Sequence, residues 1–175
     1  MSEEQLRSVL KSIRERFGVQ DAPEMKSPPA LLVPAEKIVE VCRTLRDEFG
    51  FDFLCELTAS DYWPQQTPRF HIIYGLYSNE HNLRLCLRVP LDGDYPALPT
   101  VEGVFHVANW PERELFDMFG IYIQGHSDLR RIIMPVDWEG HPLRKDYPLG
   151  YEEPQFSFNF DEIARRKHRA GSIEA

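Results

Sequence analysis

Residues 69–89 read RFHIIYGLYSNEHNLRLCLRV, and this stretch decides the fold. Two apolar runs, 69–77 and 82–89, flank the polar residues 78–81, which is the spacing of a β-hairpin. Because successive side chains of a strand point to opposite faces, we expect one face of this sheet to be buried against helices. The other face is expected to be at least partly solvated or covered by a partner. The second run alternates, with Leu83, Leu85, Leu87 and Val89 on one side and Arg84, Cys86 and Arg88 on the other.

Two amphipathic helices and a short strand precede the hairpin. Residues 2–17 carry apolar side chains at helical spacing, and Gly18 ends the pattern. Residues 30–33 predict a short strand. A second helix is expected over 34–49, again with an apolar face, and Gly50 follows its end.

Strands, loops and one short helix make up the rest of the regular structure. Residues 51–59 are apolar enough for a buried strand. Proline, glycine and polar residues predict loops over 60–68 and 91–99, and a last strand is expected within 100–107. A short helix is predicted over 109–120.

The short helix carries most of the charges that suggest chemistry. Asn109 is expected to cap it, with Glu112 at the capping-box position. Arg113 and Asp117 are four residues apart and are expected to pair on the solvent side. Glu112 and Glu114 would suit acid–base catalysis if they were buried, since burial raises the pKa of a carboxyl group. We favour a solvated charged face, because no nucleophile or cofactor motif accompanies them.

The order of elements, α-β-α-β-β-β-β-α, indicates an α+β fold. We expect a two-layer sandwich in which a mixed or antiparallel sheet carries helices on one face. The domain is expected to span 1–120. A long, irregular C-terminal extension, 121–175, follows, and a segment with so little periodicity is expected to dock on a partner.

Composition excludes several classes of protein. Of the 175 residues, 42% are hydrophobic and 27% charged, which is ordinary for a globular domain. Acidic residues outnumber basic ones by 28 to 20, and the net charge of −8 argues against nucleic-acid binding. No apolar stretch approaches the roughly 18–20 residues that span a bilayer, and the N-terminus is acidic where a targeting signal would be basic. We therefore expect a cytoplasmic chain that meets a membrane only through partners.

The three cysteines, Cys42, Cys55 and Cys86, are too far apart in sequence to form a chelating pair. Iron–sulfur and structural zinc sites usually need four ligands with at least one close pair. We expect reduced, buried thiols.

The C-terminal extension offers two pairs of candidate metal ligands, His126 with Asp128 and His141 with Asp146. Neither pair has a helical ligand spacing, so we favour a structural use, in which ion pairs and charged hydrogen bonds hold an irregular segment. The mixture of charges favours a protein partner over phosphate. Between residues 128 and 146, the basic residues that stand among the acidic ones are Arg130, Arg131, Arg144 and Lys145.

Two further features lie near the C-terminus. Phe156, Phe158 and Phe160 alternate with polar residues and are expected to be buried on this domain or on another chain. The basic run 165–169 would suit an anionic lipid or RNA, although a solvated helix end is the favoured interpretation.

The charged segment as a whole resembles a known family. The run Glu112-Arg113-Glu114-x-x-Asp117-Met118-Phe119, followed by His126 and by Arg130-x-Ile132, resembles the signature of the C subunit of bacterial NADH–quinone oxidoreductase (respiratory complex I), which is the 30-kDa-subunit family. Residues 128–135 and 140–149 extend the resemblance.

The resemblance implies a non-catalytic structural subunit of the hydrophilic arm of a proton-pumping enzyme, with no activity of its own. The chain itself would hold no cofactor: FMN, the iron–sulfur clusters and the quinone would belong to partner subunits. Its partners would be the large quinone-site subunit (the D subunit) and the neighbouring iron–sulfur subunits, at the cytoplasmic side of the bacterial membrane. The docking and scaffold residues would be Glu112, Arg113, Glu114, Asp117, His126, Asp128, Arg130, Arg131, His141, Arg144, Lys145 and Asp146.

Three alternatives stay open. The equivalent subunit of a related complex, a membrane-bound nickel–iron hydrogenase or a ferredoxin-dependent photosynthetic complex, would look much the same. A stand-alone enzyme would gather Glu112, Glu114, His126 and His141 in one pocket with shifted pKa values. A nucleic-acid-binding module would use the basic run 165–169.

Overall fold

The computed structural model describes residues 2–22, 28–93 and 95–148, so Phe156, Phe158, Phe160 and the basic run 165–169 lie outside it. The helices are α1 (Ser2–Phe17), α2 (Ile38–Phe49) and α3 (Asn109–Glu114), with short 3-10 turns η1 (Ala35–Lys37) and η2 (His106–Ala108) and a π-helical turn η3 (Leu115–Phe119). The strands are β1 (Gln20–Asp21), β2 (Ala30–Leu32), β3 (Phe53–Asp61), β4 (Phe70–Ser78), β5 (Leu83–Leu91), β6 (Ala97–Pro99) and β7 (Tyr122–Gln124).

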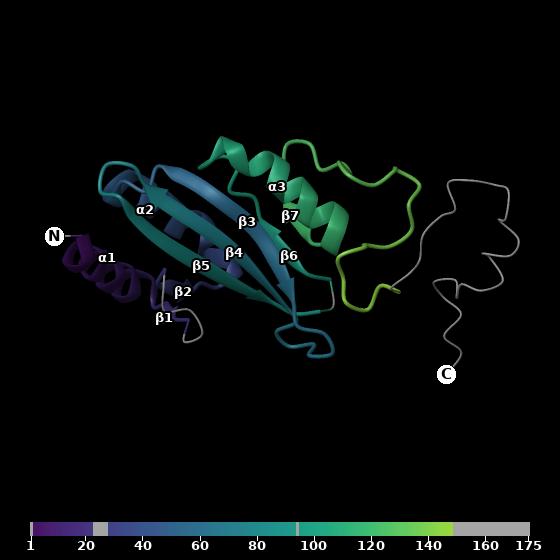
Figure 1. Cartoon of the computed structure of the whole chain (residues 1–175), viewed down its shortest axis with the longest axis horizontal. Coiled ribbons are helices and arrows are strands. Elements are labelled where there is room, and N and C mark those ends of the chain that lie inside the picture. The colour runs from purple at the N-terminus through teal and green to yellow at the C-terminus, as the bar shows by residue number, and fades with distance from the viewer. Residues whose placement is uncertain (1, 23–27, 94, 149–175) are drawn as a thin grey trace, which may run out of the picture.

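A five-stranded mixed sheet in the order β1-β2-β5-β4-β3 forms the centre of the molecule (Figure 1). The predicted hairpin is confirmed, because β4 and β5 pair antiparallel with Tyr74 opposite Leu87. β2 lies parallel to β5, and β3 lies antiparallel to β4 at the sheet edge. The short strands β6 and β7 form a separate parallel pair.

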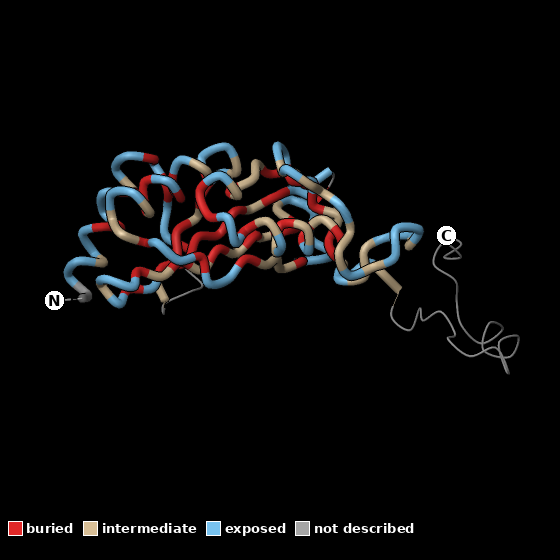
Figure 2. Tube along the Cα trace, turned by 90° about the horizontal axis from the view of Figure 1, so that it is seen from above, coloured by how far each residue is buried: buried red, intermediate tan, exposed pale blue. Residues whose placement is uncertain are grey.

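The helices pack on one face of the sheet, as predicted for a two-layer α+β fold. Ile13 of α1, Leu45 of α2 and Leu115 of η3 share one buried cluster with Tyr74 and Leu87 of the sheet. Figure 2 shows the buried residues along the middle of the molecule, with exposed residues outside them. Gly18 and Gly50, which the sequence placed after the first two helices, have positive φ angles of 64° and 69°.

The opposite face of the sheet is less exposed than the alternation in β5 indicated. Arg84 is exposed, but Cys86 is buried in a small cluster with Ala22 and Ala30. Arg88 is also buried, and its Nη2 donates to the hydroxyl of Tyr62 at 2.8 Å.

Several local predictions were wrong. Residues 51–59 do not form a fully buried strand: β3 is an edge strand with a bulge near residue 55, and Phe53 is 49% exposed. The strand expected within 100–107 is absent there. It lies instead at β6, in the predicted loop 91–99, because Leu98 pairs with Ile123, far along the chain. Cys55 is exposed, whereas the other two cysteines are buried as expected.

The start of the predicted C-terminal extension lies within the main core. Ile121 and Ile123 are fully buried there and belong to the same cluster as α1 and α2. From residue 125 to residue 148 the chain has no helix or strand and passes beyond the end of α3 in yellow-green (Figure 1). No helix in the described ranges is long and apolar enough to cross a membrane.

The central position of Leu87 makes it a test of this core. Leu87→Ala removes a fully buried side chain that lies between β2 and β4, and it should lower the free energy of unfolding by about 2–5 kcal/mol. Urea denaturation followed by circular dichroism measures the change. Arg84→Ala, on the exposed side of the same strand, is the control and should cost less than about 1 kcal/mol. Equal losses would contradict the assigned register.

Candidate functional site

The carboxylate of Asp117 is the first anchor of the irregular segment 128–148. The η3 turn holds Asp117 fully buried, and its Oδ2 accepts the backbone N–H groups of Ile132, Ile133 and Met134 at 3.0, 2.7 and 2.9 Å. Its Oδ1 accepts from Arg131 Nη1 at 2.8 Å. Burial alone would raise the pKa of Asp117, but the three N–H groups and the guanidinium together hold it below its ordinary value.

The same turn receives the later part of the segment. Nδ1 of His141 donates to the backbone carbonyl of Asp117 at 2.9 Å, and the N–H of Leu143 donates to the carbonyl of Met118 at 3.0 Å. Burial lowers the pKa of His141, and the nearby Arg131 also lowers it, so the ring is held neutral. Its imidazole lies on Gly120, where an added Cβ would be 2.5 Å from the ring.

A second anchor fixes the far end of the segment. Arg69 is buried and donates from Nε and Nη2 to the two carboxylate oxygens of Asp61, each at 2.9 Å. Its Nη1 donates to Asp146 at 3.0 Å, and the backbone N–H of Lys145 donates to Asp61 at 2.8 Å. The guanidinium lies 4.9 Å from the ring centre of Phe70, so a charged group, an aromatic ring and two carboxylates share one small volume.

These contacts shift the pKa values of both carboxyl groups of the second anchor. Burial would raise the pKa of Asp61, but hydrogen bonds from Arg69 and from the backbone of Lys145 and Trp63 lower it. The hydrogen bond from Arg69 lowers the pKa of Asp146, although its partial burial opposes this. The hydrogen bonds to Asp61 and Asp146 raise the pKa of Arg69.

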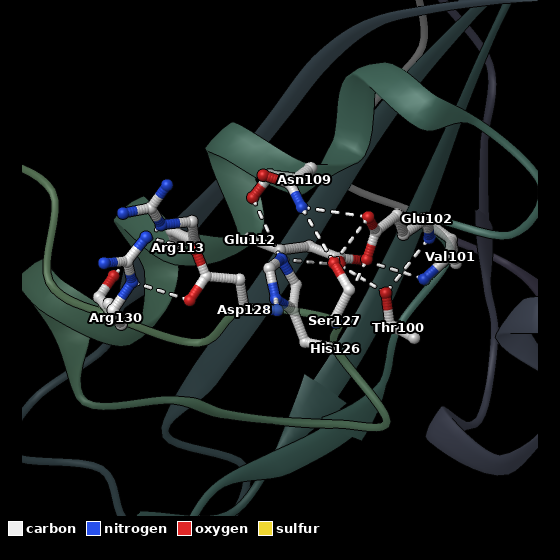
Figure 3. A network of polar contacts seen from close by, with 10 residues as sticks. All are labelled: Thr100, Val101, Glu102, Asn109, Glu112, Arg113, His126, Ser127, Asp128 and Arg130. Atoms are coloured by element: carbon white, nitrogen blue, oxygen red, sulfur yellow. Dashed lines mark hydrogen bonds and ion pairs between the residues drawn. The ribbon is translucent and has the colours of Figure 1, made fainter.

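A third cluster, shown in Figure 3, surrounds Glu112 on α3. Glu112 is 1% exposed and accepts the hydroxyl of Thr100 at 2.5 Å and the N–H of Val101 at 2.7 Å. Glu112 therefore holds the β6 end against α3 rather than forming the predicted capping box. The amide of Asn109 donates to Glu102 at 2.9 Å instead of capping the helix.

Two predictions about the charged face of this helix were wrong and one is confirmed. Arg113 does not pair with Asp117, because Asp117 is buried; Arg113 donates instead to the carbonyl of Arg130 at 3.1 Å and lies over the ring of Trp110. Glu112 is buried, contrary to the favoured solvated face. Glu114 is exposed, as that interpretation expected.

The structure therefore distributes eleven of the twelve predicted residues over three clusters, and the twelfth, Glu114, lies exposed on α3. Asp117, Arg131 and His141 form the first, and Lys145 and Asp146 belong to the second. Arg144 lies beside the second, with Nε 3.6 Å from Asp146 and its guanidinium over the ring of Phe70. The third cluster and its exposed rim contain Glu112, Arg113, His126, Asp128 and Arg130, of which Asp128 and Arg130 form a surface ion pair at 2.6 Å.

Asp61 and Arg69 were not predicted from the sequence. Their only local signal is that they stand at the two ends of the predicted loop 60–68. A charge at a strand end is usually solvated, so this position alone does not indicate a buried ion pair.

The pairs His126–Asp128 and His141–Asp146 do not form one metal site. His126 meets Asp128 through a backbone N–H, and His141 and Asp146 belong to different anchors. Within the described part of the chain, no group of three or more His, Cys, Asp or Glu side chains could hold a metal ion. A groove of about 660 Å³ beside β2 and the end of β5 contains none of the twelve residues.

The outer surface around the anchored segment carries large apolar side chains. Val136 is 93% exposed. Ile133 and Leu143 are about half exposed, although their backbone N–H groups are held by the Asp117 carboxylate and the Met118 carbonyl, respectively. Trp110 on α3 and Tyr122 on β7 are 63% and 56% exposed. A segment fixed by buried charges and apolar on its outer side is suited to contact another protein.

The Asp117 anchor can be tested by a substitution that keeps its size. Asp117→Asn removes the charge that pairs with Arg131 and should lower the free energy of unfolding by about 3–5 kcal/mol. Limited proteolysis should then cut first within 128–148. Asp128→Asn, which changes an exposed pair, is the control and should leave both measurements unchanged. Resistance of the segment in the Asp117 variant would contradict the assigned anchor.

Acid should weaken both anchors. Asp61, Asp117 and Asp146 have folded-state pKa values below their ordinary values, so their contribution to stability is present above about pH 5 and is lost as the pH falls further. Urea denaturation between pH 7 and pH 3 should give a falling free energy of unfolding. The fall should be smaller in Asp117→Asn, and an identical pH dependence in both proteins would count against the carboxylate as its source.

Known proteins resemble this chain over most of its length. The family model described as respiratory-chain NADH dehydrogenase, 30 Kd subunit, matches residues 31–153. The C subunit of NADH-quinone oxidoreductase from Roseiflexus sp. (strain RS-1) is 45% identical over 164 residues, which cover 91% of this chain and 94% of the relative. The protein of the same name from Geobacter sulfurreducens is 44% identical over 147 residues, covering 82% and 89%.

Solved structures share the fold. A trypsin-resistant fragment (1–134) of Nqo5 has a TM-score of 0.63 and 32% identity, covering 71% of this chain and 99% of the fragment. A chain of an archaeal respiratory membrane complex, the membrane-bound sulfane sulfur reductase, has a TM-score of 0.70 at 24% identity, covering 82% and 85%. The second likeness bears on the fold alone. The signature predicted from the sequence is thus confirmed: the chain belongs to the family of the 30-kDa subunit of respiratory-chain NADH dehydrogenase, whose bacterial members are named as the C subunit of NADH-quinone oxidoreductase.

Proposed function

We propose that this chain is a non-catalytic structural subunit in the hydrophilic arm of proton-pumping NADH:quinone oxidoreductase, and that segment 126–148 docks against the large quinone-site subunit. The observation that carries the proposal is that the buried charged side chains hold the backbone of a segment. Asp117, Asp61 and Arg69 are occupied by backbone N–H groups and by one another, so they position a segment instead of facing a substrate.

The chemistry of the segment supports a docking role. Its conformation comes from contacts with Asp117 and Asp61, because the segment contains no helix and no strand. Its outer side is therefore free to follow the shape of a partner. Exposed apolar side chains such as Val136 lie among charged ones such as Arg130. Interfaces between protein chains combine these two features, because apolar contact supplies affinity and charge supplies orientation.

The proposal assigns the cofactors to partner subunits. FMN, the iron–sulfur clusters and the quinone would be held there, and the family membership of this chain supports that division. Contact with neighbouring iron–sulfur subunits and a place at the cytoplasmic side of the bacterial membrane follow from membership of the arm. Flavin- and NADH-binding partners would identify an NADH-dependent complex, whereas hydrogenase or ferredoxin-linked partners would identify a related one.

Two surface substitutions test the docking. Arg130→Glu reverses an exposed charge, and Val136→Asp places a charge at a 93% exposed apolar position. Each should leave folding intact and reduce the amount of assembled arm several-fold, because desolvating an unmatched charge weakens an interface. Native gels of gently solubilised membranes from cells carrying each variant measure the assembled complex, and mass spectrometry identifies its chains.

Charge reversal at a distant site is the control. Lys11→Glu on α1 changes an equally exposed charge on another part of the molecule and should leave assembly at its normal level. Arg144→Glu should weaken assembly too, but it also removes a contact with Phe70 and Asp146, so a stability measurement must accompany it. Normal assembly in both the Arg130 and Val136 variants, or recovery of the tagged wild-type chain alone, would overturn the proposal.

A further inference from the structure

The side chain of His126 is fully buried, and both of its ring nitrogens are in use. Nδ1 lies 3.0 Å from the backbone N of Asp128, and Nε2 lies 3.1 Å from the backbone carbonyl of Asn109. A backbone N–H can only donate and a carbonyl can only accept. The ring must therefore be neutral, with its hydrogen on Nε2 and its lone pair on Nδ1.

Carboxyl groups lie close to the ring of His126. Nε2 is 3.8 Å from the carboxyl of Glu112, and the ring also interacts electrostatically with the carboxylates of Glu102 and Asp128. The two hydrogen bonds need a neutral ring. A proton added to Nδ1 would therefore remove the acceptor of the Asp128 N–H and place a positive charge beside these carboxyl groups.

Glu112 is the closest of these carboxyl groups, and opposing effects act on its pKa. Besides Glu102 and His126, the groups near it are Cys42 of α2 and Tyr74 of β4, both of which lie in the core. Burial raises the pKa of Glu112, while hydrogen bonds from Thr100 and Val101 oppose that change. Its charge therefore influences His126 from inside the core, where solvent screening is weak.

We propose that His126 and Glu112 form a proton-binding pair, and that uptake of a proton by Nδ1 of His126 releases the turn 126–128 from α3. The proton comes from solvent and occupies the Nδ1 lone pair. The N–H of Asp128 then loses its acceptor and faces another N–H, while the positive charge of the ring lies beside Glu112, whose Oε2 is 3.8 Å from Nε2. No bond other than N–H is made.

Release of this turn would affect more than one contact. Ser127, its middle residue, donates from N and Oγ to Glu102 at 3.2 and 2.8 Å, and its Oγ also lies 3.3 Å from the amide of Asn109 (Figure 3). The turn is also where the chain leaves β7 and begins the irregular segment. Proton uptake would thus loosen the start of the segment while the Asp117 and Asp61 anchors hold the rest.

Nuclear magnetic resonance of the uniformly 15N-labelled full chain, titrated from pH 8 to pH 5, tests the proposal. At pH 8 the 15N shifts of His126 should show the tautomer protonated at Nε2. As the pH falls, the ring should become protonated. The hydrogen-exchange protection factor of the Asp128 amide should decrease along the same titration curve. The protection factor is the measure because it corrects for the intrinsic pH dependence of exchange.

Two variants separate the two members of the pair. His126→Asn keeps an oxygen in the place of Nδ1 but cannot titrate, so protection at Asp128 should stay constant with pH. Glu112→Gln keeps an acceptor oxygen for the Val101 N–H, and its NH2 can donate to the Thr100 hydroxyl where the carboxylate accepted from it, but the charge is removed. The opening should then move to lower pH by about one unit. His106→Asn, at an exposed histidine outside the cluster, is the control and should titrate like the wild type.

The outcomes are decisive without reference to assembly. A wild-type Asp128 amide whose protection does not change while His126 titrates would overturn the release of the turn. An unchanged midpoint in Glu112→Gln would overturn the pairing. Should His126→Asn fail to fold, the wild-type titration and the Glu112 variant still decide. The measurement uses the chain alone. The proton-binding proposal can therefore be wrong while the proposed docking on the quinone-site subunit is right, and the docking can be wrong while the proton-binding proposal is right.

Discussion

The buried carboxylate of Asp117 is the interaction on which the irregular part of this protein depends. Three consecutive backbone N–H groups converge on one of its oxygens and a guanidinium on the other. A buried carboxylate is costly unless it is fully hydrogen-bonded, and the segment 131–134 supplies those bonds by giving up regular structure. The π-helical turn at 115–119 and the positive φ at Gly120 direct the carboxylate inward and make room for His141.

A second buried cluster of charges, around Arg69, fixes the far end of the segment that Asp117 anchors. Arg69 connects Asp61, at the end of a sheet strand, to Asp146, near the end of the described chain. With one anchor on the helix and one on the sheet, some twenty residues without helix or strand keep a defined path. Their outer side is left to apolar and charged side chains, which is the arrangement that the proposed docking on another subunit requires.

The fold was largely predictable, and the site only in part. Helical spacing over 2–17 and 34–49 and strict alternation in β5 are local signals, and the structure confirms them. β6 was missed because its partner β7 lies about twenty-five residues further along, and nothing within 97–99 announces that pairing. The predicted Arg113–Asp117 pair failed because helical spacing shows which side chains share a face but not whether that face is buried.

By itself, the sequence determined the long helices and strands, the main buried face of the sheet and the signature that identifies the family. These depend on residues a few positions apart, whose spacing along a helix or strand is fixed by backbone geometry. Only the tertiary structure decided which charges are buried. Lys145 reaches Asp61 across 84 positions, and Asp117 accepts groups from 15 to 17 residues away. Whether a carboxylate is solvated or buried depends on the donors that such distant segments bring to it, and no local pattern records them.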